Sequence, residues 1–230
     1  MDRYCRLFEM GLVEYGKAFR LQRAVAEARQ SDVISDSLII LQHPPVLTLG
    51  RRANRGNILV SQELLRQEGV ALYESTRGGD VTYHGPGQIV GYPILNLRSL
   101  RMGASDYVHN LEKVIIDCLQ HFDIEGRQDR SYIGVWVGDE KVAAIGVAVS
   151  GGVTTHGFAL NVCPNMRHFR LINPCGITDK GVTSLSRLLG RHIPVEEVQP
   201  LLIQSFARVF GMKLVPCTLD DLETLGIQIP

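Results

Sequence analysis

The stretch Arg77-Gly-Gly-Asp-Val-Thr-Tyr-His-Gly-Pro-Gly-Gln-Ile-Val-Gly-Tyr-Pro93 sets five glycines and two prolines among charged and aromatic side chains. Glycine permits a positive φ and lets another group approach the backbone where a Cβ would obstruct it. Residues 88–97, which overlap the end of this stretch, have the composition of a strand. The pattern predicts a loop that holds a ligand at a sheet edge. Two ordinary glycine turns of a hairpin explain the same composition.

The glycine spacing does not match a phosphate-binding loop, because it contains no GxxxxGK[ST] and no GxGxxG that opens a helix. Arg77 is a candidate to hold a carboxylate or phosphate, or to pair with Asp80. His84 and His156 each stand beside a glycine at an expected strand end, where each can bond a ligand or its own loop. The loop indicates a site without indicating its chemistry.

The composition is that of an ordinary globular protein. The chain has 230 residues and equal numbers of basic and acidic residues, 24 each, which argues against a nucleic-acid-binding protein. Its five cysteines include no CxxC, and its seven histidines show no metal-ligand spacing. We therefore expect no metal and a reducing cytoplasm. No apolar run is long enough to span a bilayer, and no secretory signal is visible.

Hydrophobic periodicity predicts a mixed α+β fold with a mostly antiparallel sheet and helices outside it. Residues 132–137, 141–149 and 153–162 are joined by glycine turns, which indicates an antiparallel meander. We expect one domain over residues 1–230, with a peripheral tail after about residue 210. The other expected strands are residues 5–10, 37–41, 46–49, 70–74 and 212–215. The expected helices are 14–30, 61–68 capped by Ser61, one capped by Ser105, 165–172, one from Thr178 or Asp179 to about Leu189, and 195–210.

Cys175 is the first candidate nucleophile. It stands between Pro174 and Gly176, just ahead of the helix expected from Thr178 or Asp179. A helix N-terminus can lower a thiol pKa from about 8.5 toward neutrality. The alternative is that Cys175 packs under a loop. Cys163 is a rival, whereas Cys118 lies on the apolar stripe of a helix and reads as a core residue.

Lys141 follows the turn Gly138-Asp-Glu140, where a solvated surface lysine is the ordinary expectation. On strand alternation it shares a face with Ala143, Ile145, Val147 and Val149. If that face is buried, desolvation would lower the lysine pKa and suit Lys141 to act as a base.

Taken together, five segments closely resemble the signature blocks of bacterial lipoyl(octanoyl) transferases. The resemblance spans about residues 5–210, and the five blocks occur in the family's order. They are Arg77 to Pro93, quoted above, and His43-Pro-Pro-Val-Leu-Thr-Leu-Gly-Arg51, Lys141-Val-Ala-Ala-Ile-Gly146, His156-Gly-Phe-Ala-Leu-Asn161 and Pro174-Cys-Gly-Ile177.

The resemblance implies the biotin/lipoate protein ligase fold and an acyl transfer. Octanoyl-(acyl carrier protein) would donate its acyl group to a lysine of a lipoyl carrier domain. The family's nucleophile falls on Cys175 and its partner lysine on Lys141, with Tyr92 and His156 in support. Its acyl pocket falls on Arg77, Gly78, Gly79, Asp80, Val81, Thr82, Tyr83, His84, Ala144, Ile145, Gly146, Gly157, Phe158 and Ala159.

The resemblance further implies a ping-pong reaction through an acyl-cysteine, without ATP, metal or another cofactor. The acceptors would be lipoyl domains of 2-oxoacid dehydrogenase E2 subunits and the glycine cleavage H protein. The enzyme would be a cytoplasmic monomer that binds neither nucleic acid nor membrane. Two alternatives stay open: an ATP-dependent lipoate or biotin protein ligase, which needs no catalytic cysteine, and an acyl-carrier-binding module without turnover.

Overall fold

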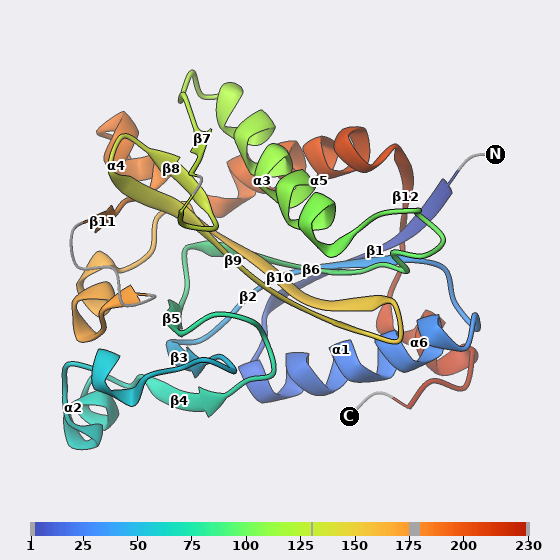
Figure 1. Ribbon diagram of the computed structural model, residues 1–230, viewed down its shortest axis with the longest axis horizontal. Helices are drawn as coiled ribbons and strands as arrows, with labels where there is room; N and C mark the ends of the chain where they lie inside the picture. Colours follow the sequence, from blue (N-terminus) through green and yellow to red (C-terminus); the bar gives the residue numbers. More distant parts are fainter. Residues whose placement is uncertain (1–2, 130, 175–179, 229–230) are drawn as a thin grey trace.

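A large mixed sheet crosses the middle of the molecule in the computed structural model, which describes residues 3–129, 131–174 and 180–228 (Figure 1). Among the described residues, nine strands form this sheet in the order β12-β1-β2-β6-β10-β9-β8-β7, with β11 paired to β9. The strands are β1 (Arg3–Leu12), β2 (Ser37–Gln42), β6 (Gln88–Ile94), β7 (Arg127–Gln128), β8 (Val135–Val137), β9 (Glu140–Ser150), β10 (Val153–Asn161), β11 (Gly181–Val182) and β12 (Met212–Pro216).

Most neighbouring strands of this sheet are antiparallel. The expected meander is confirmed, because β8, β9 and β10 pair antiparallel in chain order. β10 then pairs antiparallel with β6, and β6 with β2. The parallel pairs are β1 with β2, β1 with β12 and β11 with β9.

Helices cover both faces of the sheet (Figure 1). The helices α3 (Ala104–Gln120) and α5 (Val195–Phe210) pack together on one face, and α1 (Tyr15–Gln30) packs against β6 and β10 on the other. Strands β2 and β6 lie between these layers, and almost every one of their residues is buried. Double coverage explains why both segments are apolar runs rather than alternating strands.

A second, smaller sheet lies beside the α1 layer and has the order β4-β3-β5. Its strands are β3 (Val46–Leu49), β4 (Ala71–Glu74) and β5 (Val81–His84), and α2 (Gln62–Gln67) joins β3 to β4 together with the 3₁₀ turn η1 (Arg55–Asn57). Ser61 caps α2 as expected, since its Oγ accepts from the Leu64 N–H at 3.2 Å.

The glycine-rich stretch connects the two sheets. It contains β5 of the small sheet, turns, and continues into β6 of the main sheet. The strand after the loop, β6, lies in the interior of the main sheet, between β2 and β10. At the turn between them, Gly87 has φ 86°, and a Cβ there would lie 2.5 Å from the Cys163 carbonyl oxygen. Only glycine fits both conditions.

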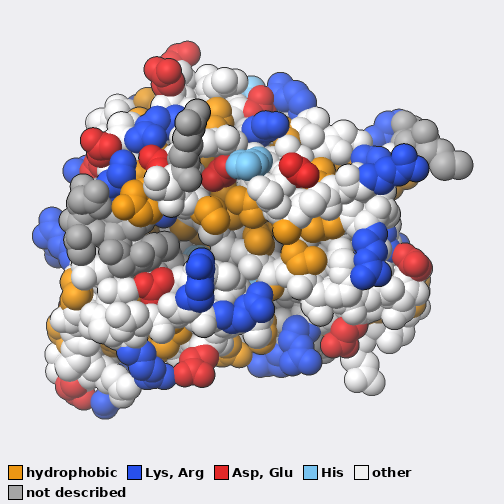
Figure 2. Space-filling view, in the orientation of Figure 1, with side chains coloured by type: hydrophobic (Ala, Val, Ile, Leu, Met, Phe, Trp, Pro, Cys, Tyr) orange, Lys and Arg blue, Asp and Glu red, His pale blue; other side chains and the backbone are white. Residues whose placement is uncertain are grey.

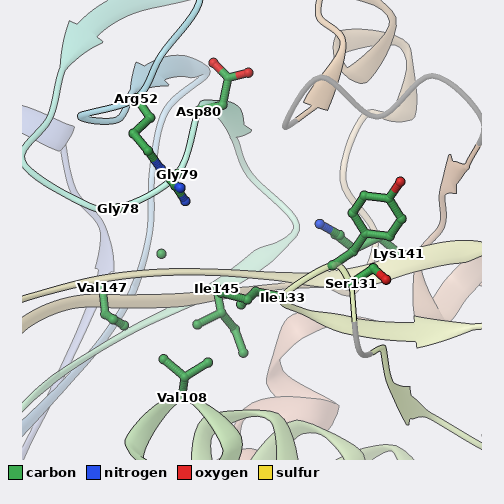
Figure 3. Close-up of a pocket in the computed structure, with 12 residues that line it drawn as sticks. Arg52, Gly78, Gly79, Asp80, Val108, Ser131, Ile133, Lys141, Ile145 and Val147 are labelled. Atoms are coloured by element: carbon green, nitrogen blue, oxygen red, sulfur yellow. The ribbon is translucent and has the colours of Figure 1, made fainter. Parts of the chain in front are cut away.

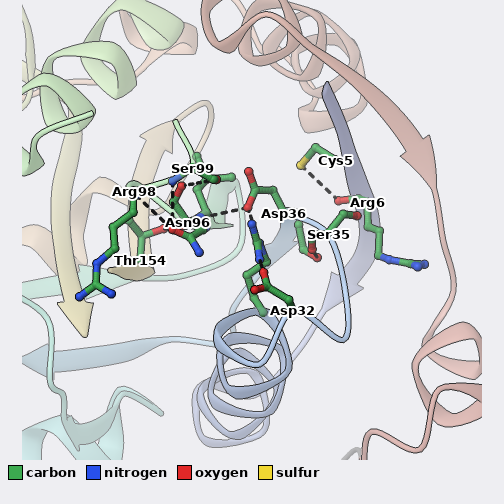
Figure 4. Close-up of polar contacts among 12 residues, drawn as sticks. Cys5, Arg6, Asp32, Ser35, Asp36, Asn96, Arg98, Ser99 and Thr154 are labelled. Carbon is green, nitrogen blue, oxygen red and sulfur yellow. Dashed lines mark hydrogen bonds and ion pairs between the residues drawn. The ribbon is translucent and has the colours of Figure 1, made fainter. Parts of the chain in front are cut away.

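A buried polar cluster fastens α1 to the end of β6 (Figure 4). The Asp36 Oδ1 atom accepts from Arg29 Nε at 2.7 Å and from the Asn96 N–H at 2.9 Å. Both charged residues are buried, with Arg29 8% and Asp36 7% exposed. The cluster fixes where α1 lies on the sheet.

Several element boundaries differ from expectation. The helix expected to be capped by Ser105 begins at Ala104, because the Asp106 carboxylate accepts from the Gly103 N–H. The segment at 165–172 is a 3₁₀ helix, η2 (Met166–Leu171). After Phe210, β12 extends the main sheet and a short helix, α6 (Leu219–Thr224), buries Leu222 against the α1 side.

The helix expected from Thr178 or Asp179 begins later, at Leu185, as α4 (Leu185–Leu189). Residues 175–179 lie outside the described residues, but Gly181 and Val182 form β11 rather than helix. Ser184 is the cap, since its Oγ accepts from the Arg187 N–H at 3.3 Å. The prediction that this helix starts at Thr178 or Asp179 was therefore wrong, because residues 181–182 are a strand.

Candidate functional site

The site forms where the glycine-rich loop meets β9. Strand β8 pairs with β9 only as far as Ala143, which leaves the next part of that edge open. The loop approaches it there, and the Gly78 N–H donates to the Val147 carbonyl at 2.9 Å. A Cβ at Gly146 would lie 3.2 Å from the Gly78 oxygen. Glycine on both segments therefore permits the loop and the strand to lie against each other.

A pocket of about 510 Å³ lies beside this junction, and we refer to it as the open pocket. Figure 3 shows Val108 of α3 and Ile145 and Val147 of β9 on one side of it, and Arg52 reaching in from the other. The space-filling view shows hydrophobic side chains along a hollow across the molecule, with lysine and arginine side chains beside it (Figure 2). The pocket thus has an apolar floor and a charged rim.

A second, smaller cavity, which we call the inner pocket, continues from the open pocket between the loop and β10. The two pockets share Gly78, Gly79, Ile145 and Gly146. Most residues that the sequence assigned to an acyl pocket line the inner pocket. They are Arg77, Gly78, Gly79, Thr82, His84, Ala144, Ile145, Gly146, Gly157, Phe158 and Ala159, together with Tyr92 and His156.

Polar aromatic side chains are buried at the inner pocket. His84 stacks on Tyr15, with ring centroids 6.1 Å apart and an interplanar angle of 12°. His43 lies behind them, and its Nε2 is 2.7 Å from the Tyr92 hydroxyl. His156 has an unusual positive φ of 58° within β10, and its Nε2 is 2.9 Å from Thr76 Oγ1. These contacts hold the rings of Tyr15, His84, Tyr92 and His156 in fixed positions around the cavity.

Burial keeps the histidine rings of this cluster neutral. It lowers the pKa of His43 to about 4 and, with the nearby positive charges of Arg77 and Arg51, the pKa of His156 to about 4. It also lowers the pKa of His84 well below its usual value. In neutral His43, Nδ1 must carry the proton, because it lies 2.6 Å from the Val13 carbonyl oxygen. Nε2 of His43 therefore accepts from the Tyr92 hydroxyl.

The neutral histidines predict that stability falls in acid. The unfolded chain binds protons at these rings near pH 6.5, whereas folded His43 and His156 bind them only near pH 4. Between those values the unfolded state binds more protons, so the free energy of unfolding rises with pH. The slope is up to about 1.4 kcal/mol per pH unit for each ring. Urea unfolding at several pH values from about 5 to 7.5 measures it. A free energy that does not change over this range would contradict the assignment.

Arg77 and Asp80, which the sequence offered as a possible pair, have other partners. The Arg77 guanidinium donates from Nε and Nη2 to Thr48 Oγ1, at 3.1 and 2.9 Å, and from Nη2 to the Thr48 carbonyl. The Asp80 carboxylate accepts from the Asn54 N–H at 2.8 Å and from the Asn57 amide. Both residues therefore hold the loop to the small sheet and the turn that follows it.

Two further predicted pocket residues lie elsewhere. Val81 is fully buried in the core of the small sheet and does not line either pocket. The Tyr83 ring packs against Phe169, and its hydroxyl lies 2.8 Å from Nδ1 of His168. Strand alternation explains this, because Val81 and Tyr83 face one side of β5 and Thr82 and His84 the other.

Lys141 is buried, with 6% of its surface exposed, and lies at one end of the open pocket. Its Nζ atom is 4.7 Å from the centroid of the Trp136 ring, a distance suited to a cation–π interaction. Lys141 also lines two small cavities together with Pro174. One of these cavities includes Ala144, which also lines the inner pocket. Of the face that carries Lys141, Lys141 and Ala143 are buried, Ile145 and Val147 are half-buried and Val149 is exposed, so only its first part is buried.

The predicted nucleophile, Cys175, lies outside the described residues. The chain on either side of the gap is close to Lys141, because Pro174 shares its cavities and Lys180 Nζ lies 5.1 Å from the same Trp136 ring. Of the other cysteines, burial raises the pKa of Cys5 far above its usual value, that of Cys118 to about 12, and that of Cys163. Raised values make these three thiols poor nucleophiles.

Tyr15 and Trp136 belong to the site although the sequence did not single them out. Tyr15 lies on the stripe of α1 that reads as core, and only the approach of β5 brings it to His84. Trp136 is the one tryptophan of the chain and comes shortly before Lys141. This nearness in sequence to Lys141 was the only sign that could have pointed to it. Within the described residues, no cluster of three metal-binding side chains occurs, and no helix is long and apolar enough to cross a membrane.

Comparison with known sequences gives consistent relatives. The family model for the lipoyl protein ligase A/B catalytic domain matches residues 14–207. The chain is 47% identical to an octanoyltransferase of Desulforamulus reducens, over 93% of each chain. It is 48% identical to an octanoyltransferase of Caldicellulosiruptor saccharolyticus, over 93% of this chain and 92% of that one. A third, from Koribacter versatilis, is 46% identical over 98% of this chain and 90% of its own.

Solved structures share the fold at low sequence identity. A putative lipoate protein ligase from T. acidophilum superposes with a TM-score of 0.79 at 13% identity, covering 98% of this chain and 92% of that one. Lipoate-protein ligase A bound with ATP gives 0.79 at 15%, with the same coverage. Biotin protein ligase from Aquifex aeolicus gives 0.51 at 12%, covering 92% and 70%. The expected biotin/lipoate protein ligase fold is confirmed.

Proposed function

Because the chain belongs to the lipoyl protein ligase A/B catalytic domain family, as its sequence blocks predict, we propose that it is an octanoyltransferase working through an acyl-cysteine on Cys175. The donor is octanoyl-(acyl carrier protein), and the acceptors are lysines of lipoyl domains of 2-oxoacid dehydrogenases and of the glycine cleavage H protein. The reaction takes place in the cytoplasm and uses no ATP.

The placement of Lys141 carries this proposal. It is buried beside Pro174, which is bonded to Cys175, and its cavity meets the wall of the inner pocket at Ala144. A cysteine thiolate that reached this cavity would have a basic group beside it and an apolar wall for an acyl chain. Activation of a thiol by an adjacent base is the usual requirement of cysteine nucleophiles.

The reaction has two steps. In the first, Lys141 takes the Cys175 proton, the sulfur attacks the donor's carbonyl carbon, and the carrier's sulfur takes that proton from Lys141 and leaves as a thiol when its C–S bond breaks. One thioester replaces another, so this step has little net free-energy change. In the second, the amine of the acceptor lysine attacks the acyl-cysteine, the acyl C–S bond breaks as the amide forms, and the proton that the amine loses passes to the Cys175 sulfur. The amide is the more stable product, which drives the transfer.

The inner pocket would hold the octanoyl chain. Ala144 of β9 and Ala159 of β10 are cross-strand partners in its wall, and Phe158 adds apolar surface. The glycines of the loop and of β9 and β10 let the chain lie directly against the backbone.

The decisive experiment mixes the purified protein with octanoyl-(acyl carrier protein), without ATP, and records its intact mass. We expect a gain of one octanoyl group that a lipoyl domain then removes. Cys175→Ala is expected to gain nothing, whereas Cys163→Ala, the matched control, keeps the adduct. If no adduct forms but transfer follows on adding ATP and free octanoate, the protein is an ATP-dependent ligase instead.

A larger side chain in the wall of the inner pocket should change which length of acyl chain the enzyme prefers. Ala159→Val adds two methyl groups to the inner pocket, where overpacking costs about 1–3 kcal/mol. We expect kcat/KM for octanoyl transfer to fall roughly tenfold relative to hexanoyl transfer. Ala148→Val, also in the meander but outside the residues that line either pocket, is the control. Equal loss with both chain lengths would argue against an acyl chain at Ala159.

A further inference from the structure

The inner pocket has polar side chains in its wall that do not line the open pocket. Tyr15, His84 and His156 line only the inner pocket and are 5%, 7% and 1% exposed. Nδ1 of His84 and Nδ1 of His156 have no hydrogen-bond partner among the described residues. Nor has Nε2 of Gln22, whose Oε1 accepts from the His156 N–H at 2.7 Å. Three buried polar atoms thus lack partners in one small region.

Such atoms are unusual, because the large majority of buried polar atoms in proteins are hydrogen-bonded. Two of the three belong to side chains that line a pocket, so a bound ligand is the natural source of their partners. The imidazoles are neutral, which makes each Nδ1 either a donor or an acceptor. A hydroxyl group both donates and accepts, and therefore satisfies either form.

The route into the pocket determines which part of a ligand reaches these atoms. The residues shared with the open pocket are glycines and Ile145, so the entrance is apolar or bare backbone. Ala159 and Phe158 continue the apolar wall. An acyl chain that enters from the open pocket meets the shared glycines and Ile145 first, and its terminal carbon can then reach the walls that contain His84 and His156.

We propose that the inner pocket accepts medium-chain acyl groups that carry a small hydrogen-bonding group, such as a hydroxyl, on the terminal carbon, bonded there by His84 and His156. The inference rests on the proposed function, because it requires the acyl chain to occupy the inner pocket. An unsubstituted octanoyl chain in the same pocket would place its methyl group against the two imidazoles.

The test is a competition between two donors. Acyl carrier protein loaded with octanoyl is mixed with an equal amount loaded with 7-hydroxyheptanoyl, in which a hydroxyl replaces the terminal methyl. The intact mass of the protein after a short reaction gives the ratio of the two acyl-enzymes. An apolar pocket end would reject the hydroxyl by roughly 5- to 150-fold. We expect the hydroxyacyl form at more than about one-fifth of the octanoyl form; a lower ratio overturns the proposal.

A variant of His84 tests whether this side chain is responsible for acceptance of the hydroxyacyl group. His84→Phe keeps a ring that can stack on Tyr15 and removes both nitrogens. It should lower the ratio of hydroxyacyl to octanoyl enzyme at least about fivefold, and His84→Gln, which can still bond a hydroxyl, should lower it less. An unchanged ratio in folded His84→Phe overturns the proposal. If that variant does not fold, the wild-type competition still decides.

The same experiment separates this inference from the proposed function. An octanoyl adduct on Cys175 without a competing hydroxyacyl adduct overturns this inference alone. If neither acyl group is attached, both the proposed function and this inference fall.

Discussion

A Lys141→Met variant is expected to form the acyl-enzyme about 10²- to 10⁴-fold more slowly than the wild-type protein, the usual contribution of a positioned acid–base group. Lys141 is buried at the edge of the open pocket with its Nζ over the Trp136 ring. Methionine keeps the length and apolar character of the stem, so the pocket should retain its shape. Rapid mixing with octanoyl-(acyl carrier protein), followed by intact mass, measures acylation directly.

Two further variants test how Lys141 acts. Lys113→Met on the exposed side of α3 is the matched control and should acylate at the wild-type rate. Lys141→Arg keeps a positive charge but cannot take a proton. If Lys141 removes the Cys175 proton, the arginine variant will be as slow as the methionine one. If its charge alone stabilises the thiolate, arginine will recover much of the rate. If Lys141→Met forms the acyl-enzyme at the wild-type rate, the lysine has no part in acylation.

Strand pairings between segments that are adjacent in sequence could be predicted from the sequence. The meander of β8, β9 and β10 was predictable because its turns carry Gly138, Gly151 and Gly152, all at positive φ. The division into two sheets was not predictable, because the sequence of β3 does not differ from that of a short buried strand in the main sheet. Its pairing with β4 and β5 rather than with the main sheet depends on contacts that are distant in sequence.

The same distinction holds for the site. The loop glycines were identified by composition, but the partners of Arg77 and Asp80 were not, since Thr48 and Asn54 lie 29 and 26 residues away. Likewise Thr178, Asp179 and Ser184 all suit a helix cap, and residue type cannot rank them. Because Gly181 and Val182 pair with β9, the chain stays extended there, and α4 begins only after Ser184.

The site also depends on α1, which contributes Tyr15 to the inner pocket and Gln22 to the His156 backbone. The ion pair between Arg29 and Asp36 holds the end of this helix, with only 10% and 9% of the two side chains exposed. Removing one partner of a buried pair typically costs 3–5 kcal/mol when the other charge is left uncompensated, and because Asp32 stays beside Arg29 we expect the lower end of this range. Position and burial thus make one carboxylate important for both stability and the pocket.

We therefore expect Asp36→Asn to lower the free energy of unfolding by about 3 kcal/mol or more. Asp32→Asn is the matched control: Asp32 also pairs with Arg29, at 2.5 Å, but its side chain is 80% exposed. An exposed pair contributes about 1 kcal/mol at most, and asparagine tolerates the positive φ of 53° at this position. Urea unfolding of the three proteins measures both effects. Equal losses in the two variants would mean that burial does not decide the strength of this pair and that α1 is held chiefly by its apolar face.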